Sequence, residues 1–257
     1  MLTDTLAQQI ERAAALIRGA RHAYAFTGAG ISTDSGIPDF RSPESGMWAK
    51  ADPMVVASLY GFMREPSRFY HWVRDLAVLF RDARPNPAHE ALAALERRGL
   101  LDGILTQNID MLHTRAGSRT VYELHGHMRQ ATCMQCFAEF DGPPIMNRFL
   151  ETGEVPYCPD CGGPIKPNVV LFGEQLPHQT FFEAQEAIRK ADLLLIIGSS
   201  LEVAPASDIP LLARRNGTRL IVINLDPTHV DALAHVTIRE RAAIVLPRIV
   251  ERLESPA

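Results

Sequence analysis

Short aliphatic runs that alternate with helix-like segments constrain the fold of this chain more than any other feature. Leu193–Ile197 and Leu220–Ile223 are continuous runs, as in parallel strands that helices cover on both faces. Shorter strands are predicted at Ala23–Phe26, Gly103–Thr106, Thr120–Leu124 and His235–Ile238. Apolar spacing predicts helices over residues 2–18, 66–80, 87–98, 179–190, 209–216 and 243–253. Strands that alternate with helices indicate the α/β class, with a doubly wound parallel sheet.

The length and charge of the chain exclude several classes of protein. Its 257 residues, of which 46% are hydrophobic, suffice for one large domain or for a domain with a small module. A net charge of -4 argues against a general nucleic-acid or membrane-surface binder. The aliphatic runs are far too short to span a bilayer, and the N-terminus lacks a basic stretch before an apolar core. We therefore expect a cytoplasmic protein with no membrane segment.

The cysteines form two C-x-x-C pairs, which is the spacing of a zinc site. They are Cys133, Cys136, Cys158 and Cys161. Zinc prefers a tetrahedron of soft ligands, and each C-x-x-C turn offers two thiolates on one side. A disulfide pair and a redox dithiol remain as alternatives. Because thiolates at all positions would close the coordination shell, the predicted zinc ion is structural and not catalytic.

Glycine and proline residues crowd the segment around the cysteines. They are Gly142, Pro143, Pro144, Gly153, Pro156, Pro159, Gly162, Gly163 and Pro164. A stretch of this kind makes little core of its own, so we expect a metal ion to hold it together. Because it interrupts the alternation of strands and helices, we interpret it as an insertion into the α/β domain.

Residues 28–41 read GAGISTDSGIPDFR and follow the first predicted strand. Gly28 and Gly30 fit the dinucleotide fingerprint G-x-G-x-x-G, but Thr33 stands where the third glycine belongs. Glycines at a strand end allow backbone N–H groups to face a pyrophosphate, and an ordinary strand-to-helix turn is the alternative. The end of the string favours a nucleotide loop, because it places a carboxylate, an aromatic ring and a guanidinium side by side at Asp39, Phe40 and Arg41.

Polar segments follow other predicted strands, at the edge where doubly wound sheets bind ligands. They are Thr106–Asp110, Leu124–Gly126, Gly198–Leu201 and Ile223–Asp226. Each of them also fits a helix cap or a turn. Among the nine histidines, His125 is the candidate for catalysis because it ends a strand and precedes a glycine. His113 and His89 lie near helix starts, and we expect structural roles for both.

Taken together, these strings resemble the sirtuins, a family of NAD-dependent protein-lysine deacylases. The matching strings are residues 28–41, 106–110 and 125–126, the two C-x-x-C pairs, and residues 166–174, 198–201 and 223–226. They occur in the order of the family and extend over nearly the whole chain. The compact size and the string Thr106–Gly117 are most similar to the bacterial and archaeal members.

The resemblance implies a Rossmann-like NAD-binding domain and a small zinc module, with NAD and an acyl-lysine peptide in the cleft between them. We place the NAD-binding domain at residues 1–126 and 170–257, with a helical insertion over residues 42–100. The zinc module then takes residues 127–169.

The resemblance also implies which residues contact NAD. Backbone N–H groups of Ala29 and Gly30, together with Arg41, suit the phosphates. Ser199 and Asn224 suit ribose hydroxyls. Phe40 would cover the reacting ribose, and the nicotinamide pocket would be lined by Ile37, Asp39, Asn108 and Asp110. The predicted cofactor-binding set is completed by Gly28, Gln107, Gly198, Ser200, Leu225 and Asp226.

The implied reaction is deacylation and not hydride transfer. The acyl oxygen of the substrate attacks the ribose carbon that carries nicotinamide, nicotinamide leaves, and an imidate forms. His125 then acts as general base on a ribose hydroxyl that attacks the imidate, and Asn108 is the second predicted catalytic residue. The products would be lysine, nicotinamide and O-acetyl-ADP-ribose. An unperturbed histidine pKa of about 6.5 suits a base that works near neutrality.

By the same resemblance, the acyl-lysine peptide lies between two segments. Val170 would accept a hydrogen bond from the substrate amide, and Phe172 would wall the acyl tunnel. The peptide backbone would pair with Gly173–Glu174 and with Glu202–Val203. Members that remove succinyl groups carry a Tyr-x-x-Arg pair, but here a valine lies three positions after Tyr70. We therefore expect acetyl and other uncharged acyl groups.

Three positions depart from common choices of the family, namely Ser199 for threonine, Lys166 for arginine and Asn168 for aspartate. All three replacements are tolerable.

Other functions stay open. A mono-ADP-ribosyltransferase would use the same pocket with a different acceptor. A nucleic-acid zinc ribbon is disfavoured because Arg148 is the one basic residue among several acidic ones in the cysteine segment. A dehydrogenase is disfavoured by the missing third glycine. We expect acyl-lysine proteins or peptides as partners, no nucleic acid and no membrane, and a monomer.

Overall fold

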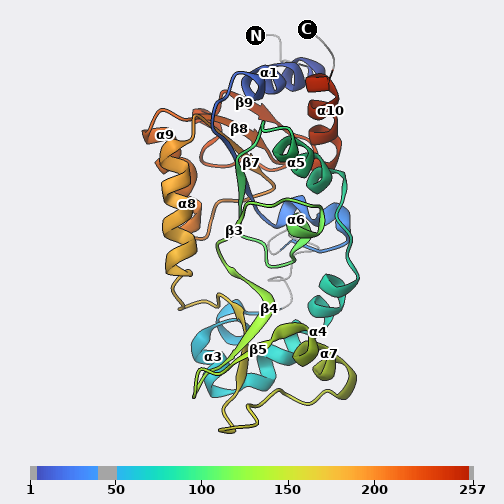
Figure 1. The fold of residues 1–257 in the computed structure, drawn as a ribbon, viewed down its shortest axis with the longest axis vertical. Coiled ribbons are helices and arrows are strands. Elements are labelled where there is room, and N and C mark those ends of the chain that lie inside the picture. The colour runs from blue at the N-terminus through green and yellow to red at the C-terminus, as the bar shows by residue number, and fades with distance from the viewer. Residues whose placement is uncertain (1–4, 40–50, 255–257) are drawn as a thin grey trace.

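Six parallel strands form the central sheet of the larger part of the molecule (Figure 1). The computed structural model describes residues 5–39 and 51–254 of the chain. In sheet order the strands are β3 (Val121–Glu123), β2 (Gly103–Thr106), β1 (Ala23–Thr27), β7 (Leu193–Ile197), β8 (Arg219–Ile223) and β9 (Val236–Ile238). Each predicted strand is present, and its ends differ from the prediction by at most one residue. The predicted doubly wound α/β class is confirmed.

Helices cover both faces of this sheet. One face carries α1 (Leu6–Arg18), α5 (Pro87–Arg97) and α10 (Ala242–Glu254), and the other carries α8 (His178–Lys190) and α9 (Ile209–Arg215). In Figure 1, α8 and α9 lie to the left of the sheet, and α5 and α10 lie to the right. Helix α1 begins after Thr5, whose side chain forms a capping box with Gln8. Over residues 5–39 and 51–254, no helix combines the length and the apolar character needed to cross a membrane.

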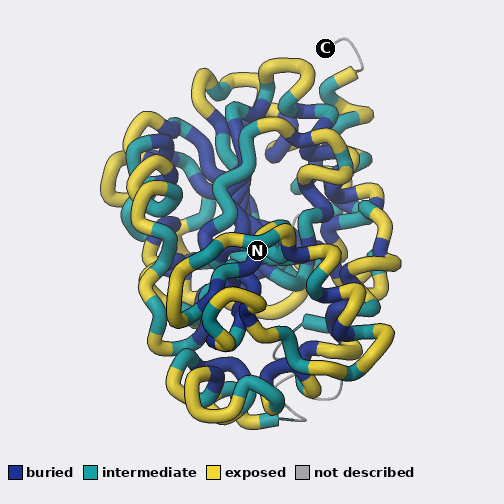
Figure 2. The backbone as a smooth tube through the Cα atoms, turned by 60° about the horizontal axis from the view of Figure 1, so that its bottom comes forward, coloured by how far each residue is buried: buried dark blue, intermediate teal, exposed yellow. Residues whose placement is uncertain are grey.

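The side chains of β7 alternate between two hydrophobic cores. Leu195 and Ile197 pack with the first group of helices, and Leu194 and Ile196 pack with the second. Every residue of β7 is buried, and Figure 2 shows that buried residues gather at the centre of the molecule. Burial on both faces explains why the sequence of β7 is aliphatic throughout.

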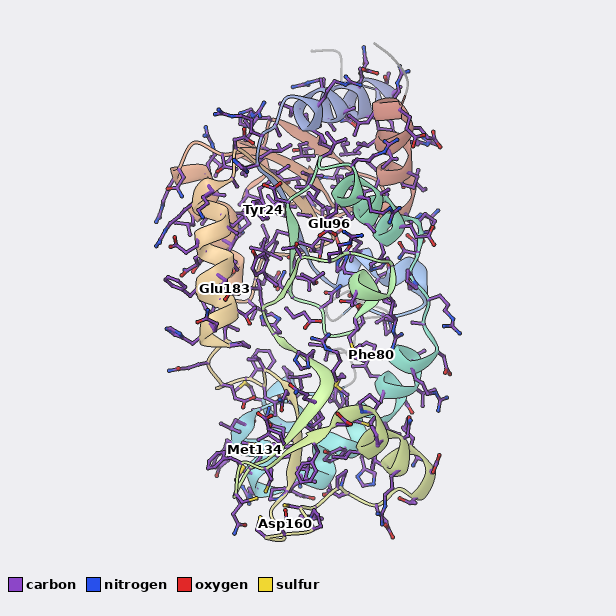
Figure 3. The ribbon with its side chains drawn as sticks, viewed as in Figure 1. Tyr24, Phe80, Glu96, Met134, Asp160 and Glu183 are labelled. Atoms are coloured by element: carbon purple, nitrogen blue, oxygen red, sulfur yellow. The ribbon has the colours of Figure 1, made fainter. Side chains whose placement is uncertain are left out.

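A smaller antiparallel sheet lies at the end of the molecule that is farthest from the termini (Figure 1). Its central strand β4 (Gly126–Cys133) pairs with β5 (Glu139–Asp141) and with β6 (Ile165–Val169). Met134 and Asp160 mark this end in Figure 3. The remaining helices are α2 (Pro53–Val56), α3 (Leu59–Arg64), α4 (Pro66–Asp82), α6 (Leu112–Arg115) and α7 (Gly142–Thr152).

Helices α3, α4 and α7 share one hydrophobic core, although they are distant in the sequence. Phe69 lies edge-on to Phe62 and to Tyr70, with ring centroids 5.4 Å apart in both pairs. Tyr70 also lies 5.0 Å from the Phe149 ring of α7, and its hydroxyl donates to the Ile165 carbonyl of β6 at 2.6 Å. Part of the predicted helical insertion therefore packs with the cysteine module, whereas α5 packs on the large sheet. The residue boundaries of the two domains stay a prediction.

Helix α7 lies in the glycine- and proline-rich segment, where no helix was predicted. Its prolines occupy the first turn, where a missing N–H group leaves no hydrogen bond unmade. A Cβ atom on Gly142 would lie 2.1 Å from the Met128 carbonyl oxygen, so the helix start lies directly against β4. Met146 and Phe149 are then buried in the shared core. This core is shared with α3 and α4 and does not belong to the segment alone. The helix itself was not predicted, because prolines at a helix start look the same in sequence as prolines in a loop.

Strands β4 and β6 are two of the segments that carry the chain between the two parts of the molecule, and the connection from α4 to α5 is another. Strand β4 begins at Gly126, directly after His125, and β6 ends directly before Val170. The Val170 N–H group donates to the His125 carbonyl at 2.8 Å. Gly126 has a φ of 76°, and a Cβ atom there would lie 2.0 Å from the Asn168 carbonyl oxygen. Only glycine permits so close a crossing of the two segments.

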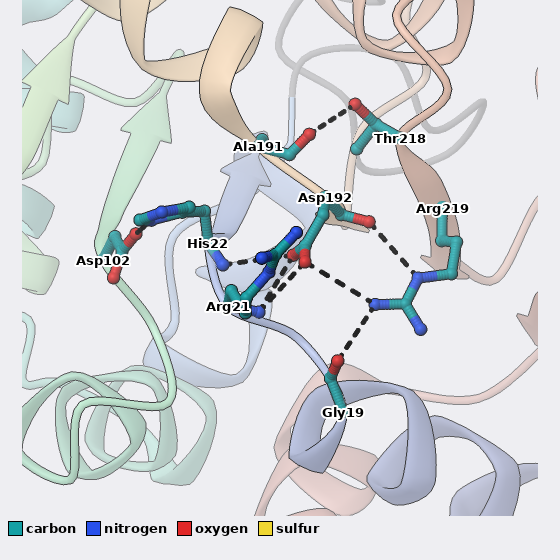
Figure 4. A network of polar contacts seen from close by, with 8 residues as sticks. All are labelled: Gly19, Arg21, His22, Asp102, Ala191, Asp192, Thr218 and Arg219. Carbon is teal, nitrogen blue, oxygen red and sulfur yellow. Dashed lines mark hydrogen bonds and ion pairs between the residues drawn. The ribbon is translucent and has the colours of Figure 1, made fainter.

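A polar network closes the edge of the large sheet where its strands begin. The Asp192 carboxylate, just before β7, accepts hydrogen bonds from the N–H groups of Arg21 and His22, and the Arg219 guanidinium lies 4.0 Å away (Figure 4). Burial raises the pKa of Asp192, but these N–H groups and Arg219 outweigh burial, so the pKa is lower than usual. The network joins the starts of β1, β7 and β8.

Candidate active site

A cleft of about 650 Å³ lies beyond the carboxyl ends of the strands in the large sheet. Strands β1 and β7 are neighbours, but the chain runs from them toward opposite sides of the sheet. Such a switch point opens a crevice that binds ligands in doubly wound folds. The segments after β1, β2, β7 and β8 line one side of the cleft, and α4 and residues 169–174 line the other.

The described residues of the predicted site all line this one cleft. The predicted catalytic and cofactor-binding residues there are Gly28, Ala29, Gly30, Ile37, Asp39, Gln107, Asn108, Asp110, His125, Gly198, Ser199, Ser200, Asn224, Leu225 and Asp226. The predicted substrate-binding residues there are Val170, Phe172, Gly173, Glu174 and Val203. Phe40 and Arg41 lie outside the described residues. The fold thus brings the predicted segments together, and the role of each residue stays a prediction.

The loops after β1 and β7 contact each other through their backbones. The Gly28 N–H group donates to the Ile197 carbonyl at 3.1 Å, and the Gly30 N–H group donates to the Gly198 carbonyl at 2.9 Å. A Cβ atom on Gly28 or Gly30 would lie within 2.9 Å of Gly198. These glycines therefore serve the close approach of two loops, and their N–H groups are engaged within the protein instead of facing a phosphate. Short 3-10 turns follow β1 in place of the helix of a dinucleotide fingerprint.

Asn108, Asp110 and Ser32 form a buried polar cluster on the wall of the cleft. The Asn108 amide donates to the Gly28 carbonyl and to Ser32 Oγ, both at 3.2 Å. Ser32 Oγ donates to Asp110 Oδ2 at 2.7 Å, and the Leu112 N–H group donates to Oδ1 at 2.9 Å. Burial raises the pKa of Asp110, although the donors Leu112 and Ser32 lower it in part. The cluster presents a carboxylate and an amide in fixed orientations.

Two buried histidines adjoin this cluster. His89 Nδ1 accepts a hydrogen bond from the Asn86 N–H group, so its proton is on Nε2, which lies 3.4 Å from Ser32 Oγ. His113 Nε2 lies 2.9 Å from Thr27 Oγ1, and the two imidazole rings are 4.9 Å apart. Burial lowers the pKa of His89 to about 4 and the pKa of His113 well below its usual value. Both rings are neutral at neutral pH, which agrees with the structural roles expected for them.

His125 is partly buried, and its imidazole lines the cleft. Its Nδ1 lies 3.0 Å from the Gln107 carbonyl oxygen. Because a carbonyl accepts hydrogen bonds, Nδ1 carries the proton of the neutral ring, and Nε2 has a lone pair for a second proton. Burial lowers the pKa of His125, and the bond to Gln107 raises it by less. The ring is therefore a neutral base at neutral pH.

Ser199 and Asn224 present polar groups at the ends of β7 and β8. Gln107 Nε2 donates to Ser199 Oγ at 2.8 Å. The Asn224 amide donates to the Asp226 carbonyl at 2.8 Å, and Arg239 donates to the carbonyls of both residues at 3.0 and 3.1 Å. These bonds fix a hydroxyl and an amide in the cleft, where the resemblance implies contacts to ribose.

Several lining residues were not predicted from the sequence. Ser32 lies inside the predicted loop, but its bond to Asp110 spans 78 positions and needs the fold. Arg241 at the start of α10 pairs with Asp34 at 2.9 Å, and no motif marked it. The apolar spacing of α4 was recognised, but the same spacing fits a helix that faces a core or a cleft. Its lining residues are Phe69, Trp72, Val73, Leu76 and Phe80.

The sulfur atoms of the four cysteines converge in the smaller part of the molecule. The Sγ atoms of Cys133, Cys136, Cys158 and Cys161 lie within 4.8 Å of one another. Cys133 lies 3.4 Å from Cys161 and Cys136 lies 3.7 Å from Cys158, so no disulfide joins them. A tetrahedral zinc ion with bonds of about 2.3 Å holds its sulfur ligands about 3.8 Å apart. The N–H group of Cys136 points at Cys133 Sγ and is the largest cause that lowers the pKa of Cys133 to about 6, whereas the pKa of Cys136 and Cys161 is raised. The cluster fits a structural zinc ion.

The chain is similar to a well-defined group of enzymes. A sequence model of the Sir2 family matches residues 28–205. NAD-dependent protein deacylase 2 of Archaeoglobus fulgidus is 46% identical over 248 residues, which cover 96% of each chain. The NAD-dependent protein deacetylase of Sulfolobus acidocaldarius is 45% identical over 251 residues, which cover 97% of each chain.

A similar solved structure supports the same relationship. It is a Sir2 enzyme variant with a deacetylated p53 peptide and 3'-O-acetyl ADP-ribose. It shares 37% identity with this chain, covers 94% of this chain and 97% of its own, and superposes with a TM-score of 0.89.

Proposed function

The chain belongs to the Sir2 family, and on this premise we propose that its cleft takes up NAD and an acyl-lysine side chain. It is an NAD-dependent protein-lysine deacetylase that removes acetyl or other uncharged acyl groups and releases nicotinamide and O-acetyl-ADP-ribose. The position of His125 carries this conclusion, because a neutral base with a free Nε2 lies in the same cleft as the Asn108–Asp110 cluster and Val170.

Different polar groups at the strand ends of the large sheet bind different parts of NAD. When bound, NAD supplies the ribose carbon that takes up the acyl oxygen and the nicotinamide that leaves. Asp110 and Asn108 bind the nicotinamide side of the cleft, where their mutual hydrogen bonds through Ser32 keep them oriented. Ser199 and Asn224 bind ribose hydroxyls at the ends of β7 and β8.

His125 acts as the general base of the reaction. Its Nε2 takes the proton of a ribose hydroxyl, while Nδ1–H stays bonded to the Gln107 carbonyl. This bond holds the ring in one tautomer and stabilises the imidazolium that forms. Nearby, the Asn108 amide donates to the Gly28 carbonyl and fixes the loop after β1.

The residues near the acyl tunnel favour uncharged acyl groups. Tyr70 is fully buried, and its hydroxyl donates to the Ile165 carbonyl, so it is not available to a substrate carboxylate. Arg74 donates to the Leu150 carbonyl. The lining from α4 is apolar, including Val73 and Phe80. A succinyl carboxylate would be buried here without a partner, at a large cost.

The cysteine cluster holds zinc as a structural ion, with Cys133, Cys136, Cys158 and Cys161 as ligands. Its thiol state also suits a reducing compartment, and we propose that the enzyme works in the cytoplasm. We further propose that it acts as a monomer on protein and peptide substrates, without nucleic-acid or membrane binding, in line with its net charge of -4.

Product analysis tests this function directly. NAD is incubated with acetyl-, propionyl- and succinyl-lysine peptides, and the products are measured by mass spectrometry. The assay compares the wild type with His125→Ala and with the control His71→Ala, because His71 is an exposed histidine of α4. We expect coupled release of nicotinamide and deacylation of the acetyl and propionyl peptides, but not of the succinyl peptide. Loss of the base lowers turnover by roughly 10²–10⁴-fold.

Two results would contradict the proposal. ADP-ribose fixed to protein without deacetylation would favour a mono-ADP-ribosyltransferase that uses the same pocket. Turnover unchanged by His125→Ala would remove this histidine from its role, since His71→Ala measures the effect of an unrelated histidine.

A further inference from the structure

Lys166 is a buried lysine whose ammonium group lies against the segment proposed to bind the substrate. Only 6% of the residue is exposed. Its Nζ donates to the Val169 carbonyl at 2.8 Å and to the Pro167 carbonyl at 3.1 Å, and it lies 3.1 Å from Glu174 Oε2. A lysine is rarely buried unless its charge is paired, so these contacts need an explanation.

Nearly every backbone group from residue 169 to residue 172 is held within the protein. The Val170 N–H group donates to His125, and the Leu171 N–H group donates to the Glu174 carboxylate at 2.7 Å. Phe172 exchanges hydrogen bonds of 2.9 Å with Ala57 and Leu59 on both of its backbone groups. The Leu171 carbonyl accepts from the Glu174 N–H group at 3.0 Å.

The Val170 carbonyl is the exception. Within residues 5–39 and 51–254, no donor bonds to its oxygen. In contrast, Lys166 binds the carbonyl of the preceding residue, Val169, and Glu174 binds the N–H group of the following residue, Leu171. Lys166 and Glu174 also bind each other, so the two members of one ion pair hold the backbone on both sides of Val170. A carbonyl left free in a rigid segment beside the cleft is an acceptor prepared for an incoming N–H group.

We propose that Lys166 is a positioning residue for acyl-lysine binding, because its ion pair with Glu174 aims the Val170 carbonyl at the substrate amide. The inference rests on the proposed function, since it assigns Val170 to the acyl-lysine site. It also gives Glu174 a different role from backbone pairing with the peptide, because its carboxylate and its N–H group are engaged with Lys166 and Leu171.

The charge of Lys166 is supported by its surroundings. Burial lowers the pKa of Lys166 below its usual value, and the Glu174 carboxylate offsets part of this shift. Replacement by an uncharged residue would leave the Val169 carbonyl without its donor and the Glu174 carboxylate without its counter-ion. Arginine keeps the positive charge and the hydrogen-bond donors.

The test compares Lys166→Met and Lys166→Arg with the wild type. Lys190→Met is the matched control, because Lys190 is exposed at the end of α8. For Lys166→Met, we expect KM for an acetyl-lysine peptide to rise roughly tenfold, with KM for NAD unchanged and kcat at saturating peptide affected much less. Lys166→Arg restores the peptide KM, and Lys190→Met leaves it unchanged.

Amide hydrogen exchange provides a readout that does not depend on activity. The amides of Val170, Leu171 and Phe172 lose protection in Lys166→Met, while those of β7 in the large sheet keep it. An unchanged peptide KM together with unchanged exchange at these amides would overturn the inference. Equal changes in KM for both substrates, or no rescue by arginine, would reduce Lys166 to a general structural residue. A wild type without deacetylation would refute the proposed function. The exchange data would still test whether Lys166 holds the backbone around Val170 in place.

Discussion

At the scale of single residues, the cleft depends on neutral histidines that the chain buries. His89 is fully buried, donates toward Ser32 and receives the Asn86 N–H group, so both of its nitrogens are engaged. Its residue type and its place at a helix start were enough to predict a structural role. Its link to Asp110 through Ser32 could not be predicted, because those three residues come from three separate segments.

Burial of His89 predicts a loss of stability in acid. Its pKa is about 4 in the folded protein and about 6.5 in the unfolded chain, so the unfolded chain binds the extra proton as the pH falls. The neutral His89 ring makes its full contribution to the free energy of unfolding above pH 6.5. About 2 kcal/mol of this contribution is lost when the pH falls from about 8 to about 5. Urea unfolding of the wild type and of His89→Gln at both pH values measures this difference.

Between these two pH values, the free energy of unfolding of His89→Gln should fall by about 2 kcal/mol less than that of the wild type. His71→Gln, which changes an exposed histidine of α4, serves as the control and should keep the wild-type dependence. Equal pH dependence in all three proteins would show that His89 does not contribute.

At the scale of elements, the strands of the large sheet were predictable and those of the small sheet were not. Strand β7 is aliphatic because helices cover both of its faces. The sequence of its five residues alone therefore predicts the strand. Strand β5 has three residues and little burial, so its pairing with β4 depends on the fold around the cysteines. Helix α7 was missed because its opening prolines match a loop equally well.

The network around Asp192 predicts that a single polar change at an element junction lowers stability. In Asp192→Ala, the N–H groups of Arg21 and His22 lose their acceptor, and Arg219 loses its ion pair but keeps its bonds to backbone carbonyls. We expect the free energy of unfolding to fall by about 2 kcal/mol. Denaturant unfolding measures it against Asp75→Ala, an exposed carboxylate on α4. A loss no greater than that of the control would mean that the junction does not depend on Asp192.

At the scale of the whole molecule, the zinc cluster supports the half of the cleft that faces the substrate. The small sheet shares its core with α4 and α7, and α4 lines the cleft. A segment that is poor in core residues gains its folding free energy from the metal.

Removal of zinc should therefore unfold one part of the molecule and leave the other. We expect one zinc ion per chain by elemental analysis. After chelation, amides of β4, β6 and α7 lose protection from hydrogen exchange, those of β1, β7 and β8 keep it, and deacetylation is lost. Addition of zinc restores both. Deacetylation that persists in zinc-free protein would contradict the structural role of the ion.

The crossing of the chain at Gly126 has one more consequence. The base at His125 and the acceptor at Val170 lie on two of the connecting segments, and a hydrogen bond of 2.8 Å joins their backbones. Because this bond joins the two segments at the cleft, the base and the substrate acceptor keep one spacing, and a change that lengthens the bond would disturb proton transfer and substrate binding together.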